Sequence, residues 1–201
     1  LKTPLAAIKS YAEKLRLGAV NDPDNNLHFV RRIEEQADRL HELILDMLQI
    51  ARIESGQQTF NIVDVSLAEL IDECLAQFAD VAGAKQIDLV GELPNETITA
   101  RGDEEGLRTI LSNLVDNAIK YTQAGGAVTV RLRSDSGWIL EVEDTGIGIS
   151  PTDRERVFDR FYRVLGTDAD GSGLGLAIVR EIAHRHGALL ILDEIPIALG
   201  R

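Results

Sequence analysis

The chain has 201 residues, a formal net charge of -12 and 44% hydrophobic residues. This length allows one or two domains that bury ~70% of the surface of the unfolded chain. The acidic charge argues against duplex nucleic acid or an anionic membrane surface as a partner. No apolar run reaches the roughly 18 residues of a spanning helix. The single cysteine, Cys74, excludes an internal disulfide and fits a buried position in a helix.

The first 55 residues have the spacing of a helical hairpin. Apolar residues recur three and four positions apart in two runs: Leu1, Leu5, Ile8, Ala12, Leu15 and Val30, Ile33, Ala37, Leu40, Ile44, Met47, Ala51. The segment Asn21–Asn25 reads as the turn between them. One hairpin has too little core to fold alone, so residues 1–55 are expected to form a homodimer through a four-helix bundle. The alternative is that the hairpin packs on the rest of its own chain.

Residues 60–201 alternate between strand and helix patterns after a polar linker, 55–59. Strands are predicted at 60–65, 87–93, 128–133, 138–144 and 189–192. Helices are predicted at 66–83, from Asp103 through Asn117, from Pro151, and at 174–186. The fold class is therefore α+β: a helical hairpin followed by an α/β sandwich whose mixed sheet carries helices on one face.

A polar face is predicted on the helix that follows Asp103. Asn113, Asn117 and Lys120 share one side of it, while an apolar stripe lies on the other side. Amide oxygens are hard ligands that suit Mg²⁺, and a lysine suits phosphate. Alone, such a face is as easily a solvated surface.

Two glycine-rich segments follow this helix. Asp144-Thr-Gly-Ile-Gly148 closes a predicted strand, where a carboxylate can accept a hydrogen bond from an exocyclic amine such as that of adenine. Gly171-Ser-Gly-Leu-Gly175 opens a predicted helix, where free N–H groups favour phosphate. Neither segment fits the two common nucleotide fingerprints. Each alone could be a turn, but the polar helix and both segments in this order indicate a nucleotide site.

These motifs, with Leu1-Lys-Thr-Pro4 and Val157–Arg163, resemble those of the sensor histidine kinases of bacterial two-component systems. The resemblance covers the chain to about Gly187. It implies a dimeric hairpin (1–55) followed by a catalytic ATP-binding domain (60–201) of the fold shared with gyrase and heat-shock chaperones. It also implies Mg²⁺-ATP-dependent phosphorylation of a histidine, and transfer to an aspartate in the receiver domain of a response regulator.

The resemblance assigns roles around the base and the metal. It makes Asn117 a Mg²⁺ ligand, with Asn113 close to the same ion, and it places Tyr121 in the pocket lining. Asp144 would bind the adenine amino group, and Gly146 and Gly148 would shape the floor of the pocket.

The resemblance also assigns roles around the phosphates. Lys120 and Arg163 would contact them, with Arg163 at the γ-phosphate, so that Asn113, Lys120 and Arg163 form the implied catalytic set. Phe158 and Phe161 would anchor a mobile lid. The phosphate cradle would consist of Gly171, Gly173 and Gly175, with Leu174 nearby.

The sequence departs from the family's pattern at three places. The family's phosphoacceptor histidine, followed by a Glu or Asp, would lie two positions before Leu1. The chain is therefore expected to be the cytoplasmic portion of a longer sensor that meets the membrane only through other segments. Thr3 would then be a candidate phosphatase residue, or else a helix-capping hydroxyl. The segment 165–170 is a short lid, and 188–197 lacks the usual closing turn. His28, His41, His184 and His186 are expected at the surface or at helix ends.

Other functions remain possible for such a chain. An ATPase of the gyrase or chaperone type needs a Glu where Asn113 stands, because a neutral carboxamide is a poor base for activating water. The hairpin argues against such an ATPase and against a serine kinase of the anti-sigma type, which lacks one. A catalytically silent, dimeric nucleotide-sensing module is the further alternative.

Overall fold

The computed structural model describes residues 2–55, 60–94, 98–134, 137–164, 171–188 and 190–191. These residues belong to two compact units, Leu1–Glu54 and Ser55–Arg201, which are taken in turn below. Among the described residues, no helix combines the length and the apolar character needed to cross a membrane.

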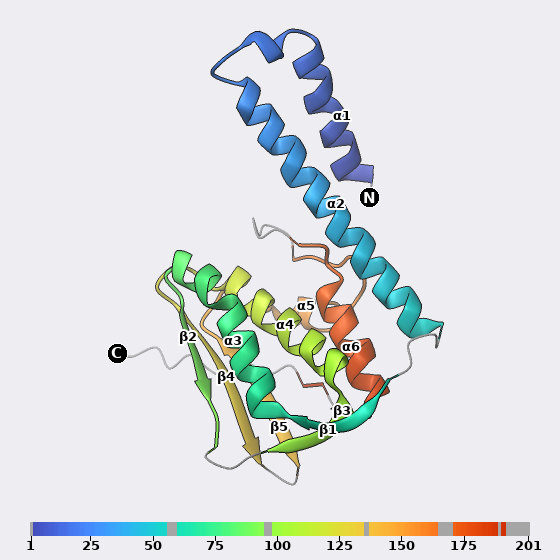
Figure 1. Ribbon diagram of the computed structural model, residues 1–201, viewed down its shortest axis with the longest axis vertical. Coiled ribbons are helices and arrows are strands. Elements are labelled where there is room, and N and C mark those ends of the chain that lie inside the picture. Colours follow the sequence, from blue (N-terminus) through green and yellow to red (C-terminus); the bar gives the residue numbers. More distant parts are fainter. Residues whose placement is uncertain are drawn as a thin grey trace. The chain divides into compact units, whose positions relative to one another are not determined.

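The first unit is an antiparallel helical hairpin (Figure 1). Helix α1 spans Lys2–Arg16, a 3-10 turn η1 spans Ala19–Asn21, and helix α2 spans Asn26–Glu54. The Asp22 carboxylate closes the connection, because it accepts hydrogen bonds from Asp24 N at 3.0 Å and from Asn25 Nδ2 at 2.8 Å. These bonds lower the pKa of Asp22, the larger effect coming from the Asn25 side chain. The turn lies where the sequence predicts it.

The predicted apolar seam of the hairpin divides into two parts. Ile8, Leu15 and Ile33 are half-buried, and the Tyr11 and Phe29 rings lie 6.0 Å apart between the two helices. Another part stays exposed in this single chain: Leu5, Val30, Ile44 and Met47 are exposed by 51%, 40%, 43% and 39%. One hairpin therefore covers only part of its own apolar surface.

The second unit begins with a strand that leads directly into a helix. Strand β1 spans Ile62–Ser66, and Ser66 Oγ accepts a hydrogen bond from Glu69 N, which caps helix α3, Leu67–Ala84. Strand β1 pairs antiparallel with β3, Thr99–Asp103, in a two-stranded sheet. Strand β3 is not predicted from the sequence, since Thr-Ala-Arg-Gly-Asp lacks an alternating apolar pattern. Its strand conformation depends on the backbone of β1.

The second unit also contains a three-stranded mixed sheet. Strand β2, Asp88–Glu92, lies parallel to β4, Ala127–Ser134, which pairs antiparallel with β5, Trp138–Asp144. Helices α3 and α4, Glu104–Tyr121, cover one face of it (Figure 1). Val128, Val130 and Leu132 of β4 are buried against the helices. The predicted α/β sandwich, with a mixed sheet under helices, is confirmed.

The opposite face of this sheet is polar. Arg131 of β4 forms ion pairs with Glu92 of β2 and with Glu141 and Glu143 of β5, at 2.5 to 3.3 Å. The hydrogen bonds that Arg131 donates, the larger effect coming from that to Glu92 and the next from that to Glu143, raise the pKa of Arg131. Ion pairs thus link the side chains of neighbouring strands on the solvent-exposed face of the sheet.

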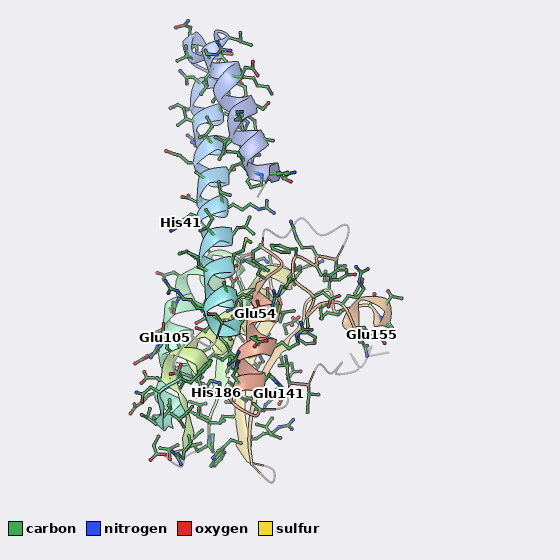
Figure 2. The ribbon with its side chains drawn as sticks, turned by 90° about the vertical axis from the view of Figure 1, so that its right-hand side faces the viewer. His41, Glu54, Glu105, Glu141, Glu155 and His186 are labelled. Carbon is green, nitrogen blue, oxygen red and sulfur yellow. The ribbon has the colours of Figure 1, made fainter. Side chains whose placement is uncertain are left out.

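Two further helices complete the unit: α5, Pro151–Arg154, and α6, Gly175–Arg185, which packs beside α4. His186 follows α6 (Figure 2). Its Nε2 accepts a hydrogen bond from Asp103 N at 3.0 Å, and its ring meets Phe60 edge-on. His186 is a helix-end residue, as predicted. The last predicted strand, 189–192, lies outside the described residues apart from 190 and 191, and so does the predicted short lid, 165–170.

Candidate functional site

Helix α4 carries four of the predicted site residues: Asn113, Asn117, Lys120 and Tyr121. The Asp103 carboxylate begins the helix by accepting a hydrogen bond from Gly106 N at 2.8 Å, and Glu104 and Glu105 place negative charge in its first turn. Leu111 and Val115 of its apolar stripe are fully buried. The opposite face carries the partly exposed polar side chains Asn113, Asn117 and Lys120. The amphipathic pattern therefore directs the candidate residues outward.

The first residue of α6 lies directly on this polar face. A Cβ atom at Gly175 would stand 2.6 Å from Asn113 Oδ1 and 3.8 Å from Asn117 Nδ2. Asn113 Nδ2 donates to Thr109 O at 2.9 Å, which leaves Oδ1 on the side of Gly175. Only glycine allows the start of α6 to approach the two carboxamides this closely.

Lys120 is held by a residue that sequence reasoning missed. Its Nζ lies 2.6 Å from Asp116 Oδ2, one helical turn earlier on α4. Asp116 also lines an open hollow of about 220 Å³, together with Phe78 of α3, Ser112 and Asn113. The four-residue spacing of acid and base along a helix was the signal for this pair.

A second residue that sequence reasoning missed, Lys85, holds the end of α4. Lys85, at the end of α3, donates from Nζ to Ile119 O at 2.6 Å and to Lys120 O at 2.8 Å. Positive charge at a helix C-terminus opposes the negative end of the helix dipole and satisfies carbonyls that have no partner within the helix. Lys85 therefore fixes the turn that carries Lys120 and Tyr121.

The segment after β5 folds against the same end of α4. Asp144 Oδ1 accepts a hydrogen bond from Gly146 N at 2.9 Å, and Ile147 N donates to Tyr121 O at 3.3 Å. A Cβ atom at Gly146 would stand 2.6 Å from Tyr121 O, and Gly148 has a positive φ of 68°. Both glycines are thus required by the backbone, and they bring Asp144 beside Tyr121.

The Phe161 and Gly173 backbones cross closely. Phe161 N donates to Gly173 O at 2.8 Å, and both residues have positive φ, of 62° and 70°. A Cβ atom at Gly173 would stand 2.9 Å from Phe161 C. The Phe161 side chain is 54% exposed, whereas Phe158 is half-buried. A left-handed phenylalanine is strained, and this crossing holds it.

The neighbouring residue Tyr162 is anchored to α5. Its hydroxyl donates to Asp153 Oδ1, and the Arg156 guanidinium lies 4.3 Å from the centre of its ring. The hydrogen bond to Asp153 raises the pKa of Tyr162. The Ser150 hydroxyl, followed by that of Tyr162, lowers the pKa of Asp153. Sequence reasoning included Tyr162 in a motif but gave it no role.

The structure gathers the predicted site residues into three groups. Asn113, Asn117 and Lys120 lie on one face of α4, with Gly175 against the two carboxamides. Tyr121 lies beside Asp144, Gly146 and Gly148, and Phe161 crosses Gly173. Leu174 is fully buried and precedes α6, and its N–H donates to Ser172 Oγ at 3.0 Å.

Arg163, Gly171 and Thr3 are predicted residues that these groups do not include. Arg163 and Gly171 are half-buried in the segments that follow Tyr162 and precede Ser172. Thr3 is exposed on α1, in the hairpin unit.

The two parts of the chain match two family models. Residues 1–56 match the His Kinase A (phospho-acceptor) domain. Residues 102–196 match the model described as Histidine kinase-, DNA gyrase B-, and HSP90-like ATPase.

Individual relatives agree with these matches. Sensor histidine kinase RppB of Synechocystis sp. is 36% identical over 206 residues, which cover 100% of this chain and 44% of RppB. The chain thus spans less than half the length of this relative.

Two solved structures are similar as well. Mycobacterial sensor histidine kinase MprB is 35% identical with a TM-score of 0.53, over 64% of this chain and 81% of MprB. Full-length ShkA, solved in complex with AMPPNP, is 30% identical with a TM-score of 0.68, over 82% of this chain and 34% of ShkA. The resemblance drawn from the motifs is confirmed, and the chain belongs to the sensor histidine kinases of two-component systems.

Proposed function

We propose that this chain provides the phosphoacceptor hairpin (1–55) and the catalytic domain (60–201) of a sensor kinase. The kinase transfers the γ-phosphoryl group of ATP to a histidine and then to an aspartate of a response-regulator receiver domain. The observation that carries the proposal is the contact between α4 and α6, where Gly175 lies against Asn113 and Asn117. It puts a glycine-rich helix start beside two carboxamides, on a helix face that also carries the Lys120 ammonium, and such a set of groups suits a triphosphate.

The base of the nucleotide is assigned to the opposite end of the site. The Asp144 carboxylate keeps acceptor capacity beyond its bond to Gly146 N, so it can receive the exocyclic amine of adenine. Gly146 and Gly148 leave room for a flat ring beside the backbone, and Tyr121 lines the same region. ShkA, a relative at 30% identity, was solved with AMPPNP, an adenine nucleotide, which supports the same ligand class here.

The carboxamides fit a magnesium ion. Asn113 Oδ1 faces the start of α6 while its Nδ2 is engaged with Thr109 O, and Asn117 stands one turn further on. Amide oxygens are ligands that Mg²⁺ accepts alongside phosphate oxygens and water. Asn117 and Asn113 would hold the ion, which supplies neutralisation of phosphate charge and alignment of the γ-phosphoryl group.

The remaining residues would position the phosphates for transfer. Lys120 and Arg163 supply positive charge, and the N–H groups of the Gly171–Gly175 turn supply hydrogen bonds. In the reaction, the bond from the γ-phosphorus to the ADP oxygen breaks as a bond to an imidazole nitrogen forms. Asn113 is neutral and a poor base, so loss of the phosphoryl group to water should be slow.

Partners and location follow from the family. We infer a homodimer through residues 1–55, since the exposed apolar part of the hairpin needs a second copy to cover it. The acceptor histidine is proposed to lie two positions upstream of Leu1 in the parent protein, and Thr3, exposed on α1, remains the candidate phosphatase residue. The parent protein is proposed to be a sensor whose cytoplasmic portion includes this chain.

Calorimetric titration with ATP, with and without Mg²⁺, tests the site. The unchanged chain should bind ATP more tightly with the ion, and Asn117→Ala should lose most of that magnesium-dependent gain. Gln77→Ala removes an exposed carboxamide from α3 and serves as the matched control. Absence of binding heat in the unchanged chain would refute the proposal. Equal affinities in Asn117→Ala and Gln77→Ala would refute the metal assignment alone.

A further inference from the structure

The Lys120 ammonium has a competing partner within its own helix. It lies 2.6 Å from Asp116 Oδ2, and the two side chains are 36% and 38% exposed. Asp116 lines the hollow that also contains Phe78 of α3, so the carboxylate lies towards α3. The pair therefore satisfies Lys120 before any nucleotide is present.

The position of Asp116 makes it unfavourable for an anionic ligand. Asp116 directly precedes Asn117 and is three residues after Asn113, which shares the same hollow. A triphosphate that reaches Asn113, Asn117 and Lys120 would meet a carboxylate of like charge at their edge. Such a contact weakens binding through repulsion and through the loss of the existing ion pair.

We propose that Asp116 is an affinity-setting residue of this kinase that restrains Lys120 and thereby weakens nucleotide binding. This inference rests on the proposed function, because it assumes that Lys120 contacts phosphate. It assigns to Asp116 a role opposite to that of the carboxamides on the same face. A lower affinity shortens the time that ADP occupies the site, which lets ATP replace it after each transfer.

An alternative role for the same pair predicts the opposite result. Asp116 could hold Lys120 in the position in which it meets the phosphate, and removing the carboxylate would then weaken binding. The two roles differ in the sign of the change, so one substitution distinguishes them.

The test is the affinity of the Asp116→Asn variant for Mg²⁺-ATP and Mg²⁺-ADP, measured by calorimetry on the whole chain. The substitution keeps the size of the side chain and removes its charge. We expect both nucleotides to bind about two- to fivefold more tightly, the range given by an ion pair of this exposure. The gain should shrink as salt is added, because salt screens exposed charges.

Glu105→Gln is the matched control for general charge effects. It removes one negative charge from the first turn of the same helix, far from Lys120 in sequence (Figure 2 labels Glu105). The affinity of Glu105→Gln for Mg²⁺-ATP and Mg²⁺-ADP should equal that of the unchanged chain within the error of the measurement. An equal gain in Glu105→Gln would show that net charge, and not the ion pair, sets the affinity.

A double-mutant cycle with Lys120→Met shows whether Asp116 acts through Lys120. In the Lys120→Met background, Asp116→Asn should have at most a small effect on affinity. The proposal would be overturned if Asp116→Asn gave its full gain in affinity in the Lys120→Met background. It would also be overturned if the Asp116→Asn single variant bound the nucleotides no more tightly, or more weakly, than the unchanged chain. A failure of the unchanged chain to bind ATP would instead overturn the proposed function, so the two failures are distinguishable.

Discussion

At the scale of single residues, the candidate site depends on positions where one added methyl group has no space. Gly175 is the clearest of these, since a Cβ atom there would stand 2.6 Å from Asn113 Oδ1. Its backbone is that of a helix start, which alanine would otherwise favour. Any loss of Mg²⁺-ATP affinity when Gly175 is replaced by alanine therefore reports the packing of α6 against α4 and not the local backbone.

Gly175→Ala should weaken Mg²⁺-ATP binding by at least about tenfold, or about 1.4 kcal/mol, because the methyl group displaces the Asn113 carboxamide. Calorimetry on the variant measures this change. Gly83→Ala is the control, since a Cβ atom at Gly83 in α3 meets nothing within 4 Å. Unaltered binding in Gly175→Ala would show that Asn113 does not take part in the site.

At the scale of elements, α5 and the segment after it are joined by ionisable groups. Asp153 accepts the Tyr162 hydroxyl, and this bond raises the pKa of Tyr162 above its ordinary value of 10.0. The hydrogen bonds to Asp153, from Ser150 and then Tyr162, lower its pKa below 3.8. The carboxylate therefore contributes stability above pH 3.8 that is lost as pH falls through its lowered pKa. The phenol contributes stability below pH 10.0 that is lost as pH rises through its raised pKa.

The difference in absorbance near 295 nm between the unchanged chain and Tyr162→Phe should show a phenol that ionises above pH 10.0. In Asp153→Asn the same phenol should ionise nearer to that value, because the acceptor has lost its charge. An unchanged midpoint in Asp153→Asn would mean that the bond is absent in solution.

Local signals predicted the elements better than they predicted the contacts between them. Ser66 and Asp103 each begin a helix as expected, since capping depends on a few neighbouring residues. Strand β3 was missed because its conformation depends on β1, which is distant in sequence. Lys85 was missed for the same reason: its partners, Ile119 and Lys120, lie on another helix.

The candidate site shows the same division. Glycine spacing and the polar face of α4 indicated which residues to consider. The spacing of Asp116 and Lys120 allows an ion pair, but its formation, like the close approach of Gly175 to Asn113, is established only by the folded chain. A motif describes what a residue can bind, whereas a competing partner is a property of the three-dimensional structure.

At the scale of the whole molecule, the exposed apolar residues of the hairpin support the proposed homodimer. Ile44 and Val30 of α2 are exposed by 43% and 40%, although both belong to the predicted apolar seam. A second hairpin would bury them, as the four-helix bundle requires. The charge of -12 on each chain opposes association, so this apolar contact must outweigh the repulsion.

The unchanged chain should therefore sediment as a dimer, and Ile44→Glu should sediment as a monomer, because a carboxylate would be buried without a partner in the bundle. Arg31→Glu places a carboxylate at an exposed polar position of α2 and should remain dimeric. If the unchanged chain proved to be a monomer at micromolar concentration, the bundle assignment would fail.

The hydrogen bond between Phe161 and Gly173 has a consequence for protein engineering. Phe161 N and Gly173 O lie 2.8 Å apart, so this bond fixes together the two ends of the segment between them. Lengthening a closed loop costs little, about 0.6 kcal/mol for each doubling. An insertion between Phe161 and Gly173 should therefore cost little stability.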